Sequence, residues 1–309
     1  MPRNKGFTHM RKQISLKKEK KETLSFYIFI SPWLIGFFGL ILFPILFSLI
    51  ISFTEWNGIA APSFIGVKNY FFMVSGDDKF WISVKNTIYF TFASVPLSIA
   101  FSLLLAVLLN RKILGANFFR SLFYLPSVIA GVSIYIVWAW IYDPNMGVIN
   151  YLLSIFGIKG PLWLLDENWA MPAIIIMAIT NCGGNMLIFL AGLQGIPKEL
   201  SDASLIDGCG AILQFFHITI PLLAPVVFFN SMMGFIYGLQ IFAQPYIMTR
   251  GGPYDSTYVL NLHIYNESFR YNYFGYGAAL SWVLFIIVLI ISFLFYKVTK
   301  NYVNYEEGK

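Results

Sequence analysis

The sequence has few charged residues and almost no cysteine. Charged side chains make up 12% of its 309 residues, whereas 58% of the residues are hydrophobic. Soluble domains carry roughly a quarter of charged residues, and a soluble fold of this length could not cover so much apolar surface. A lipid environment removes the need to cover it. The two cysteines, Cys182 and Cys209, are too far apart in the chain for a CxxC metal site and do not suggest a disulfide framework.

Acidic residues are absent from the long apolar runs. A helix needs roughly 20 residues to cross a hydrocarbon core of about 30 Å, and six runs reach that length, at 27–53, 88–110, 122–142, 170–193, 222–242 and 276–299. Every Asp and Glu lies outside them. Because a transporter driven by an ion gradient is expected to hold carboxylates inside the membrane, that class is disfavoured. The fold class predicted is an all-α integral membrane protein with six transmembrane helices.

Lysine and arginine are distributed unevenly between the two sides of these spans. Most of the 21 basic residues fall on the side that holds both termini. Cytoplasmic loops carry the excess of positive charge in membrane proteins, so both termini are predicted to be cytoplasmic. The same rule explains the net charge of +6 without nucleic acid as a partner. The expected organisation is a basic tail at 1–25, a six-helix domain at 26–300 and a short tail at 301–309.

The outer segment 143–169 is longer than a simple turn. Ile149, Leu152, Leu153 and Phe156 recur at helical spacing in it, which predicts a short helix lying at the membrane interface. In the fifth span, Gly234 and Gly238 form a small-xxx-small pattern that permits close helix approach.

The connection at 194–221, between spans four and five, is long and partly apolar. Pro197 suits the first position of a helix, and a helix is predicted over 198–206. Gly208 and Gly210 permit a sharp turn, after which 211–218 is predicted to form a second short helix before span five begins near Pro221. Its apolar side chains need a cover, which is either the protein's own bundle or a partner.

Residues of this connection match a known motif. ATP-binding-cassette importer permeases carry Glu-Ala-Ala, three residues, Gly, nine residues, Ile, one residue, Leu and Pro in this loop. The chain resembles that pattern at the same spacing, with Asp202, Ala203, Ser204, Gly208, Ile218, Ile220 and Pro221. Asp202, Ser204 and Ile220 are conservative departures from it.

Further segments are similar to the first membrane subunit of the maltose-type carbohydrate branch of this family. They are WNG at 56–58, GVKNY at 66–70, AGLQGIPKEL at 191–200 and MTRGGPYDST at 248–257. The resemblance implies the type I importer permease fold in a bacterial cytoplasmic membrane. It also implies three kinds of partner protein, namely a second homologous permease, a cytoplasmic ATPase dimer and an extracytoplasmic solute-binding protein.

The resemblance gives the connection at 194–221 a role. It would form a coupling helix seated in the ATPase, with Asp202, Ala203, Ser204, Gly208, Ile218 and Pro221 as the matching positions. The chain lacks a GxxxxGK[ST] phosphate loop. The expectation is therefore that it is not an enzyme and has no cofactor, and that the partner subunit binds ATP.

A path for the solute is predicted from polar residues in spans four and five. A hydroxyl-rich solute needs amides and aromatic faces, which are supplied by Asn181, Asn185, Tyr237, Gln240, Phe242 and Gln244. The amides could instead bridge helices. The expected cargo is a sugar or an oligosaccharide, with glycerol phosphate or another polar solute as the alternative. His9, His217 and His263 stand alone in the sequence, and they are expected to be surface or packing residues.

Overall fold

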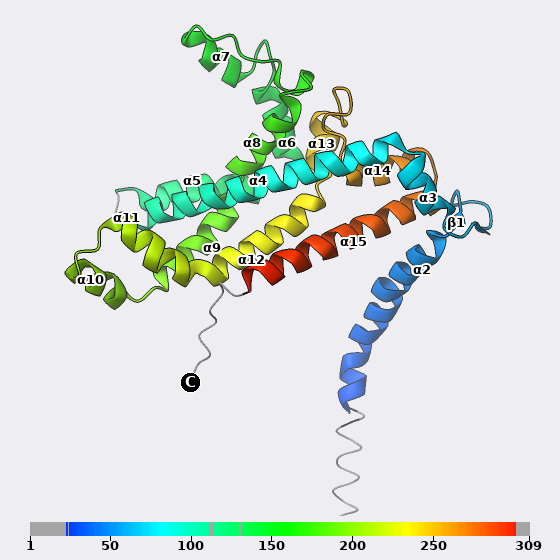
Figure 1. Cartoon of the computed structure of the whole chain (residues 1–309), viewed down its shortest axis with the longest axis horizontal. Helices are drawn as coiled ribbons and strands as arrows, with labels where there is room; N and C mark the ends of the chain where they lie inside the picture. The colour runs from blue at the N-terminus through cyan, green and yellow to red at the C-terminus, as the bar shows by residue number, and fades with distance from the viewer. Residues whose placement is uncertain (1–22, 24, 112–113, 130, 301–309) are drawn as a thin grey trace, which may run out of the picture.

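The computed structural model describes residues 23, 25–111, 114–129 and 131–300, except for the side chain of Ser201. The predicted tail 301–309 and nearly all of the tail 1–25 lie outside the described residues. The described chain consists of helices, one small hairpin and the loops that connect them (Figure 1).

The first half of the described chain contains the hairpin and the long helix α4. Its elements are η1 (Phe37–Leu42) and α2 (Phe43–Ile51) within one helix from Ser25, the antiparallel strands β1 (Thr54–Glu55) and β2 (Ser63–Phe64), α3 (Lys68–Ser75), α4 (Asp78–Asn110), α5 (Ala116–Val128), α6 (Gly131–Ile141), α7 (Val148–Ile155) and η2 (Trp163–Leu165).

The second half contains the loop between spans four and five and the last two spans. Its elements are α8 (Ala170–Thr180), α9 (Gly183–Gln194), α10 (Lys198–Ile206), α11 (Ala211–Gln214), η3 (Phe215–Thr219), α12 (Ile220–Leu239), α13 (Ala243–Met248), α14 (Leu260–Tyr265), η4 (Asn266–Arg270) and α15 (Phe274–Thr299).

The described helices agree with six spans. Four are long and apolar enough to cross a membrane: Ser25–Ile51, Asp78–Asn110, Ala211–Leu239 and Phe274–Thr299. The other two predicted spans are bent pairs, α5 with α6 at 104° and α8 with α9 at 41°. If each bent pair crosses once, the number of spans is the predicted one.

Two helix boundaries differ from prediction for physical reasons. Helix α4 begins at Asp78, ahead of the expected residue 88, because Asp77 caps a polar first turn that hydropathy does not detect. Its 33 residues extend roughly 50 Å, more than the hydrocarbon core requires. The separate helix predicted over 211–218 was wrong, because α11, η3 and α12 form one continuous helix from Ala211 to Leu239 that passes through Pro221.

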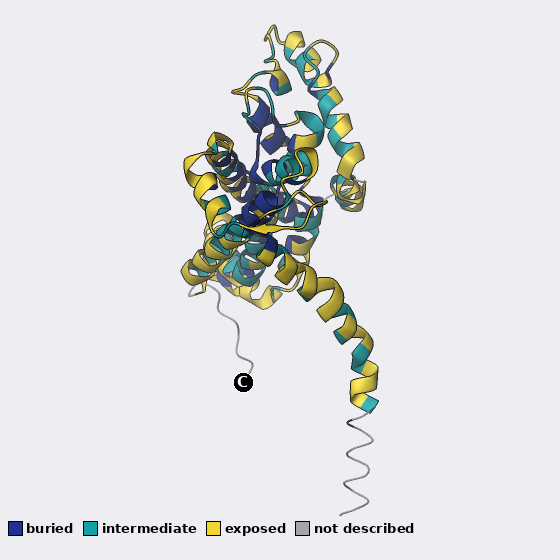
Figure 2. Ribbon diagram, turned by 90° about the vertical axis from the view of Figure 1, so that its right-hand side faces the viewer, coloured by how far each residue is buried: buried dark blue, intermediate teal, exposed yellow. Residues whose placement is uncertain are grey.

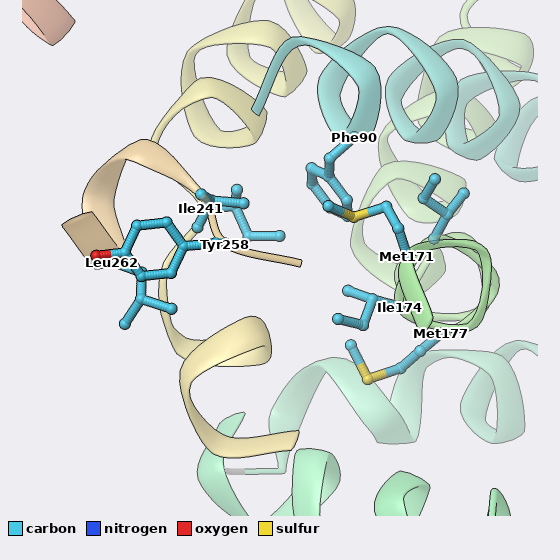
Figure 3. Packing of buried hydrophobic residues seen from close by; sticks show 9 residues of the cluster. Phe90, Met171, Ile174, Met177, Ile241, Tyr258 and Leu262 are labelled. Atoms are coloured by element: carbon cyan, nitrogen blue, oxygen red, sulfur yellow. The ribbon is translucent and has the colours of Figure 1, made fainter. Parts of the chain in front are cut away.

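Helix α4 is the central element of the bundle, and it packs against α8, α9 and α12. The predicted close approach at Gly234 and Gly238 is confirmed. A β-carbon at Gly234 would lie 2.8 Å from a methyl carbon of Val95, and one at Gly238 would lie 3.0 Å from the Thr91 methyl carbon. One apolar cluster joins α4 and α8 to Ile241 and to the residues 258–262 at the start of α14, and it includes Phe90, which faces Met171 (Figure 3).

Two parts of the chain extend away from the bundle. The helix Ser25–Ile51 leaves it at an angle and is exposed along most of its length (Figures 1 and 2). Helix α7 lies at the end of the arm made by α6 and α8 (Figure 1), and it confirms the short helix predicted in the segment 143–169. Apolar exposure of this extent is suited to lipid rather than to water.

Candidate functional site

Span four is interrupted at a polar sequence. Helix α8 ends at Thr180, Asn181 leaves the helical conformation with φ −82° and ψ 43°, and α9 begins at Gly183. A β-carbon on Gly183 would lie 2.3 Å from the Phe123 carbonyl oxygen, so only glycine allows α5 to approach the break this closely. The Cys182 carbonyl oxygen at the break accepts the Met186 N–H of α9 at 2.9 Å and the Ser102 hydroxyl of α4 at 3.3 Å. Irregular backbone at membrane depth is tolerated where such partners satisfy it.

Span five is interrupted in a similar way. Helix α12 ends at Leu239, and α13 begins at Ala243 after a turn in which Phe242 takes φ −144° and ψ −57°. The side-chain amide of Asn261 donates to the Gln240 carbonyl oxygen at 2.7 Å and so ties the break to α14. Both interruptions leave polar groups beside the same part of α4.

All six residues predicted for the solute path line one cavity of about 550 Å³ between these two breaks. Asn181 and Asn185 come from span four, and Tyr237, Gln240, Phe242 and Gln244 come from span five. Their common location is observed, whereas their contact with a cargo stays a prediction.

The sequence argument missed the wall that α4 contributes. Phe90, Ser94 and Ser98 line the same cavity, although the prediction drew only on spans four and five. Ser94 and Ser98 are four residues apart, so they lie on one face of the helix. That spacing within an apolar span was the signal that could have located them.

The connection between spans four and five has the predicted helix and turn. Helix α10 spans Lys198–Ile206 as predicted and ends with Gly208 at φ +75°. The Cys209 amide donates to the Ser204 carbonyl at 2.9 Å and the Gly208 amide donates to the Leu205 carbonyl at 3.1 Å. This pair of bonds is the Schellman arrangement, in which glycine takes the left-handed conformation after the helix.

The matched motif positions differ in exposure. Asp202 and Ala203 are exposed, Ser204 is buried, and Ile218 is half-buried in the π-helical segment η3. Pro221 is exposed within the continuous helix. The motif therefore presents its first two side chains outward and turns the third one inward.

The apolar side chains of this connection are largely uncovered by the protein's own bundle. Ile206 is 87% exposed and Ile212 is 78% exposed. A shallow groove lined by Ile212, Leu213 and Phe216 has almost no polar surface. His217 is exposed beside this groove, as expected. Of the two covers left open by the sequence, the exposure favours a partner.

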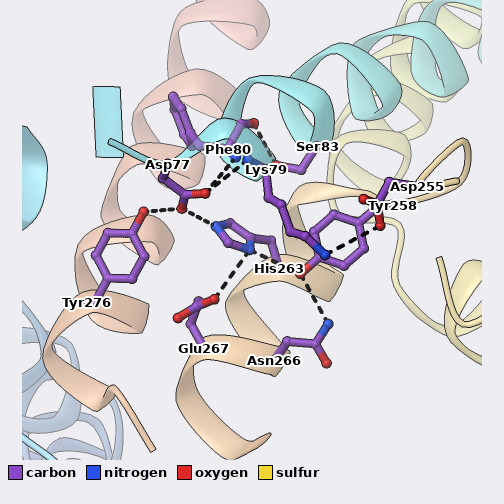
Figure 4. Close-up of polar contacts among 10 residues, drawn as sticks. All are labelled: Asp77, Lys79, Phe80, Ser83, Asp255, Tyr258, His263, Asn266, Glu267 and Tyr276. Atoms are coloured by element: carbon purple, nitrogen blue, oxygen red, sulfur yellow. Dashed lines mark hydrogen bonds and ion pairs between the residues drawn. The ribbon is translucent and has the colours of Figure 1, made fainter. Parts of the chain in front are cut away.

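Asp77 joins three helices at the other end of the bundle (Figure 4). Its Oδ1 accepts the backbone N–H groups of Lys79 at 3.0 Å and Phe80 at 3.2 Å, and so caps α4. Its Oδ2 accepts the hydroxyl proton of Tyr276 in α15 and the Nε2–H of His263 in α14, the latter at 2.7 Å. One carboxylate thus holds together the ends of α4, α14 and α15.

His263 is a buried partner in this network. Its side chain is 1% exposed, and its Nδ1 accepts the Tyr258 hydroxyl at 3.1 Å. The Tyr258 oxygen in turn accepts the side-chain amide of Asn266 at 3.1 Å. With Nε2 donating to Asp77, these contacts select one tautomer of an uncharged imidazole. The expectation that His263 stands alone was wrong, because its partner Asp77 is 186 positions away.

Burial and charge shift the pKa values of Asp77, His263 and the nearby Glu267 in different directions. Burial would raise the pKa of Asp77, but the bonds from Tyr276 and His263 outweigh it and hold that pKa below its ordinary value. Burial lowers the pKa of His263 despite the attraction of Asp77. Burial, with the charge of Asp77, raises the pKa of Glu267 to about 7. At neutral pH the network therefore contains a charged Asp77 and an uncharged His263.

Comparison of the sequence with known proteins relates this chain to membrane transport proteins. Residues 98–302 match the sequence profile of the family described as "Binding-protein-dependent transport system inner membrane component". The probable ABC transporter permease protein YesP of Bacillus subtilis is 39% identical over 305 residues, which cover 97% of each chain. The lactose transport system permease protein LacF of Rhizobium radiobacter is 37% identical over 276 residues, which cover 87% of this chain and 91% of LacF.

A solved structure shares the fold. A chain of a bacterial ABC transporter involved in the import of the acidic polysaccharide alginate superimposes with a TM-score of 0.82. The match covers 94% of this chain and all of the other chain, at 19% sequence identity. At that identity the likeness concerns the fold, which is that of a type I importer permease.

Proposed function

Since this chain belongs to the family of binding-protein-dependent transport system inner membrane components, we propose that it moves a sugar or an oligosaccharide through a multi-pass permease whose motor is another subunit. The partners are a second homologous permease, a cytoplasmic ATPase dimer that binds and hydrolyses ATP, and an extracytoplasmic solute-binding protein. Both termini lie in the cytoplasm, and the six helices are surrounded by the lipid of the cytoplasmic membrane.

The cavity between the two broken spans carries the proposal for the cargo. Among the described residues that line it, the polar ones offer amides and hydroxyls and none is charged. Amides and hydroxyls satisfy sugar hydroxyls, while Tyr237 and Phe242 offer faces for the apolar side of a sugar ring. A phosphorylated solute would favour cationic side chains in the cavity. The lactose permease among the relatives supports the same class of cargo.

The continuous helix Ala211–Leu239 supports a mechanism for coupling. One end of this helix carries the apolar groove with Ile212 and Phe216, and the other end carries Tyr237 at the cavity. Its 29 residues extend roughly 43 Å as a single rod. When the ATPase subunit displaces the groove, the helix transmits the displacement to the cavity wall. Asp202 and Ala203 on α10, with Gly208 and Pro221, form the contact with the ATPase, and the buried Ser204 and half-buried Ile218 lie behind this contact surface.

Uptake of labelled sugars by the complete importer in proteoliposomes tests the cargo. We expect Asn185→Ala and Gln240→Ala each to raise the half-saturating sugar concentration about tenfold, since a lost polar contact of about 1.4 kcal/mol has that effect. The exposed outer residue Asn168 supplies the matched control Asn168→Ala, which should leave uptake unchanged. Uptake of phosphorylated solutes alone, or unchanged kinetics in both cavity variants, would contradict the proposal.

A further inference from the structure

A second, smaller cavity adjoins the solute cavity. It has a volume of about 110 Å³ and shares three lining residues, Ala178, Asn181 and Gln244, with the larger one. Its remaining wall includes Tyr135 and Trp138 of α6. Because Asn181 and Gln244 line both cavities, the two cavities adjoin at these side chains. The small cavity is called the side cavity below.

Two aromatic rings stand on one face of α6 in the side cavity. Tyr135 and Trp138 are three residues apart, which places both on the same side of the helix. The Trp138 ring is backed by Tyr142 with a centroid distance of 5.3 Å, and the Tyr142 hydroxyl donates to the Ala173 carbonyl oxygen at 2.8 Å. The Tyr142 side chain is fully buried. Trp138 is therefore held from behind in one position, as a preorganised binding surface needs to be.

The other lining groups of the side cavity suit hydroxyl groups. Asn181 and Gln244 supply amides, and Tyr135 and Thr180 supply hydroxyls, although the Thr180 hydroxyl already donates to the Met177 carbonyl at 2.7 Å. Aromatic faces beside a few amides are the combination that binds a sugar ring, since one side of the ring is apolar and its edge carries hydroxyls.

The volume of the side cavity matches one sugar unit. A water-sized group needs about 10–15 Å³ by this measure, so 110 Å³ holds roughly seven to eleven such groups. One hexose unit within an oligosaccharide has roughly eleven non-hydrogen atoms, which makes the side cavity large enough for one unit at most. The larger cavity, at about 550 Å³, has room for a complete sugar.

We propose that the side cavity binds the second sugar unit of an oligosaccharide, stacked on Trp138 and Tyr135, while the first unit lies in the larger cavity. The inference rests on the proposed sugar import and adds to it that the cargo contains at least two linked units. Trp138 and Tyr135 then determine the preference for chain length, and Asn181 and Gln244 contact the sugar at the linkage.

The test measures uptake by the complete importer in proteoliposomes, with labelled mono-, di- and trisaccharides of glucose, galactose and xylose as probes. We expect Trp138→Leu to lower uptake of the di- and trisaccharides fivefold to tenfold relative to the monosaccharide. Trp138→Tyr, which keeps a ring, should retain the preference. Tyr135→Leu gives a second test if Trp138→Leu does not assemble. Trp140→Leu is the matched control, because Trp140 lies on the same helix and is 59% exposed.

The outcomes separate the two proposals. If the wild type imports sugars and Trp138→Leu lowers uptake of every length equally, or of none, the side cavity has no role in chain length and only the inference fails. If the wild type imports monosaccharides but no longer sugars, the inference is overturned and the proposed sugar import is not. If the wild type imports oligosaccharides but no monosaccharide, lower uptake by Trp138→Leu with normal uptake by Trp138→Tyr supports the inference. Lower uptake by both variants contradicts it. If no sugar is imported, both proposals fall.

Discussion

Replacing Asp77 is the most direct test of how the end of the bundle is held together. Asp77→Ala removes the cap of α4 and leaves two buried donors, the Tyr276 hydroxyl and the His263 Nε2–H, without their acceptor. Asp77→Asn keeps an oxygen for the cap. Its amide can donate to His263 Nε2 once the imidazole moves its proton to Nδ1, where the Tyr258 oxygen accepts it. Asp77→Ala therefore leaves both buried donors without an acceptor, whereas Asp77→Asn leaves only the Tyr276 hydroxyl proton without one.

The structure gives an expected loss of folding free energy for each variant. Loss of a helix cap costs about 1 kcal/mol, and each buried donor without a partner costs about 1–3 kcal/mol. Asp77→Ala should therefore cost roughly 3–7 kcal/mol, although contributions within one network do not add strictly. Asp77→Asn keeps the cap and a partner for His263 but leaves the Tyr276 hydroxyl without its acceptor, and it should cost about 1–3 kcal/mol. At about 2–4 °C per kcal/mol, these values correspond to thermal shifts of roughly 6–28 °C for Asp77→Ala and roughly 2–12 °C for Asp77→Asn.

The assay is the fraction of purified protein that stays monodisperse in detergent after heating, followed by size-exclusion chromatography. Asp78→Ala is the matched control, because Asp78 is the next residue, is exposed and lies in the first turn of the same helix. It should shift the transition by only a degree or two, through the helix dipole. If Asp77→Ala were no less stable than Asp78→Ala, the buried donors would not depend on Asp77. If Asp77→Asn were as unstable as Asp77→Ala, the partners that asparagine restores would not account for the stability.

Two further predictions concern coupling and pH. Gly208→Leu strains the left-handed position at φ +75° by about 1–2 kcal/mol, so it should leave ATP hydrolysis by the complete importer intact but lower the amount of sugar imported per ATP. Gly208→Asn tolerates that conformation and should import normally, and an equal amount of sugar per ATP in the two variants would contradict this prediction. Burial raises the pKa of Glu267 from 4.5 to about 7, so the folded state binds an extra proton in this window and stability falls as the pH rises through it. Glu267→Gln removes this dependence of stability on pH, so the variant should be more stable to heat than the wild type at pH 8, by at most about 3 kcal/mol. At pH 4.5 the two proteins should be similarly stable. Parallel curves of stability against pH between these values would refute the raised pKa of Glu267.

The spans and the helix 198–206 could be predicted because their signals are local. Hydropathy locates a membrane span from about twenty neighbouring residues, and Pro197 and Gly208 mark the two ends of α10 by backbone preference alone. Hydropathy does not detect the break in span four, since the apolar run continues on both sides of it. The polar residues Asn181 and Asn185 marked the place, but the 41° bend depends on how Gly183 meets α5.

The residues that the sequence argument missed share a physical reason. A serine within a membrane helix commonly bonds to its own backbone, as Ser102 does to the Ser98 carbonyl at 2.6 Å, so its presence does not reveal a cavity. Neither Ser94 nor Ser98 alone therefore indicated a cavity, and only their four-residue spacing places them on a shared face of α4. His263 and Asp77 are an ordinary histidine and an ordinary cap residue until α14 is placed beside the start of α4. Pairing at that separation follows from how the spans pack, which a single sequence does not encode locally, and for this reason the network at Asp77 had to be read from the structure.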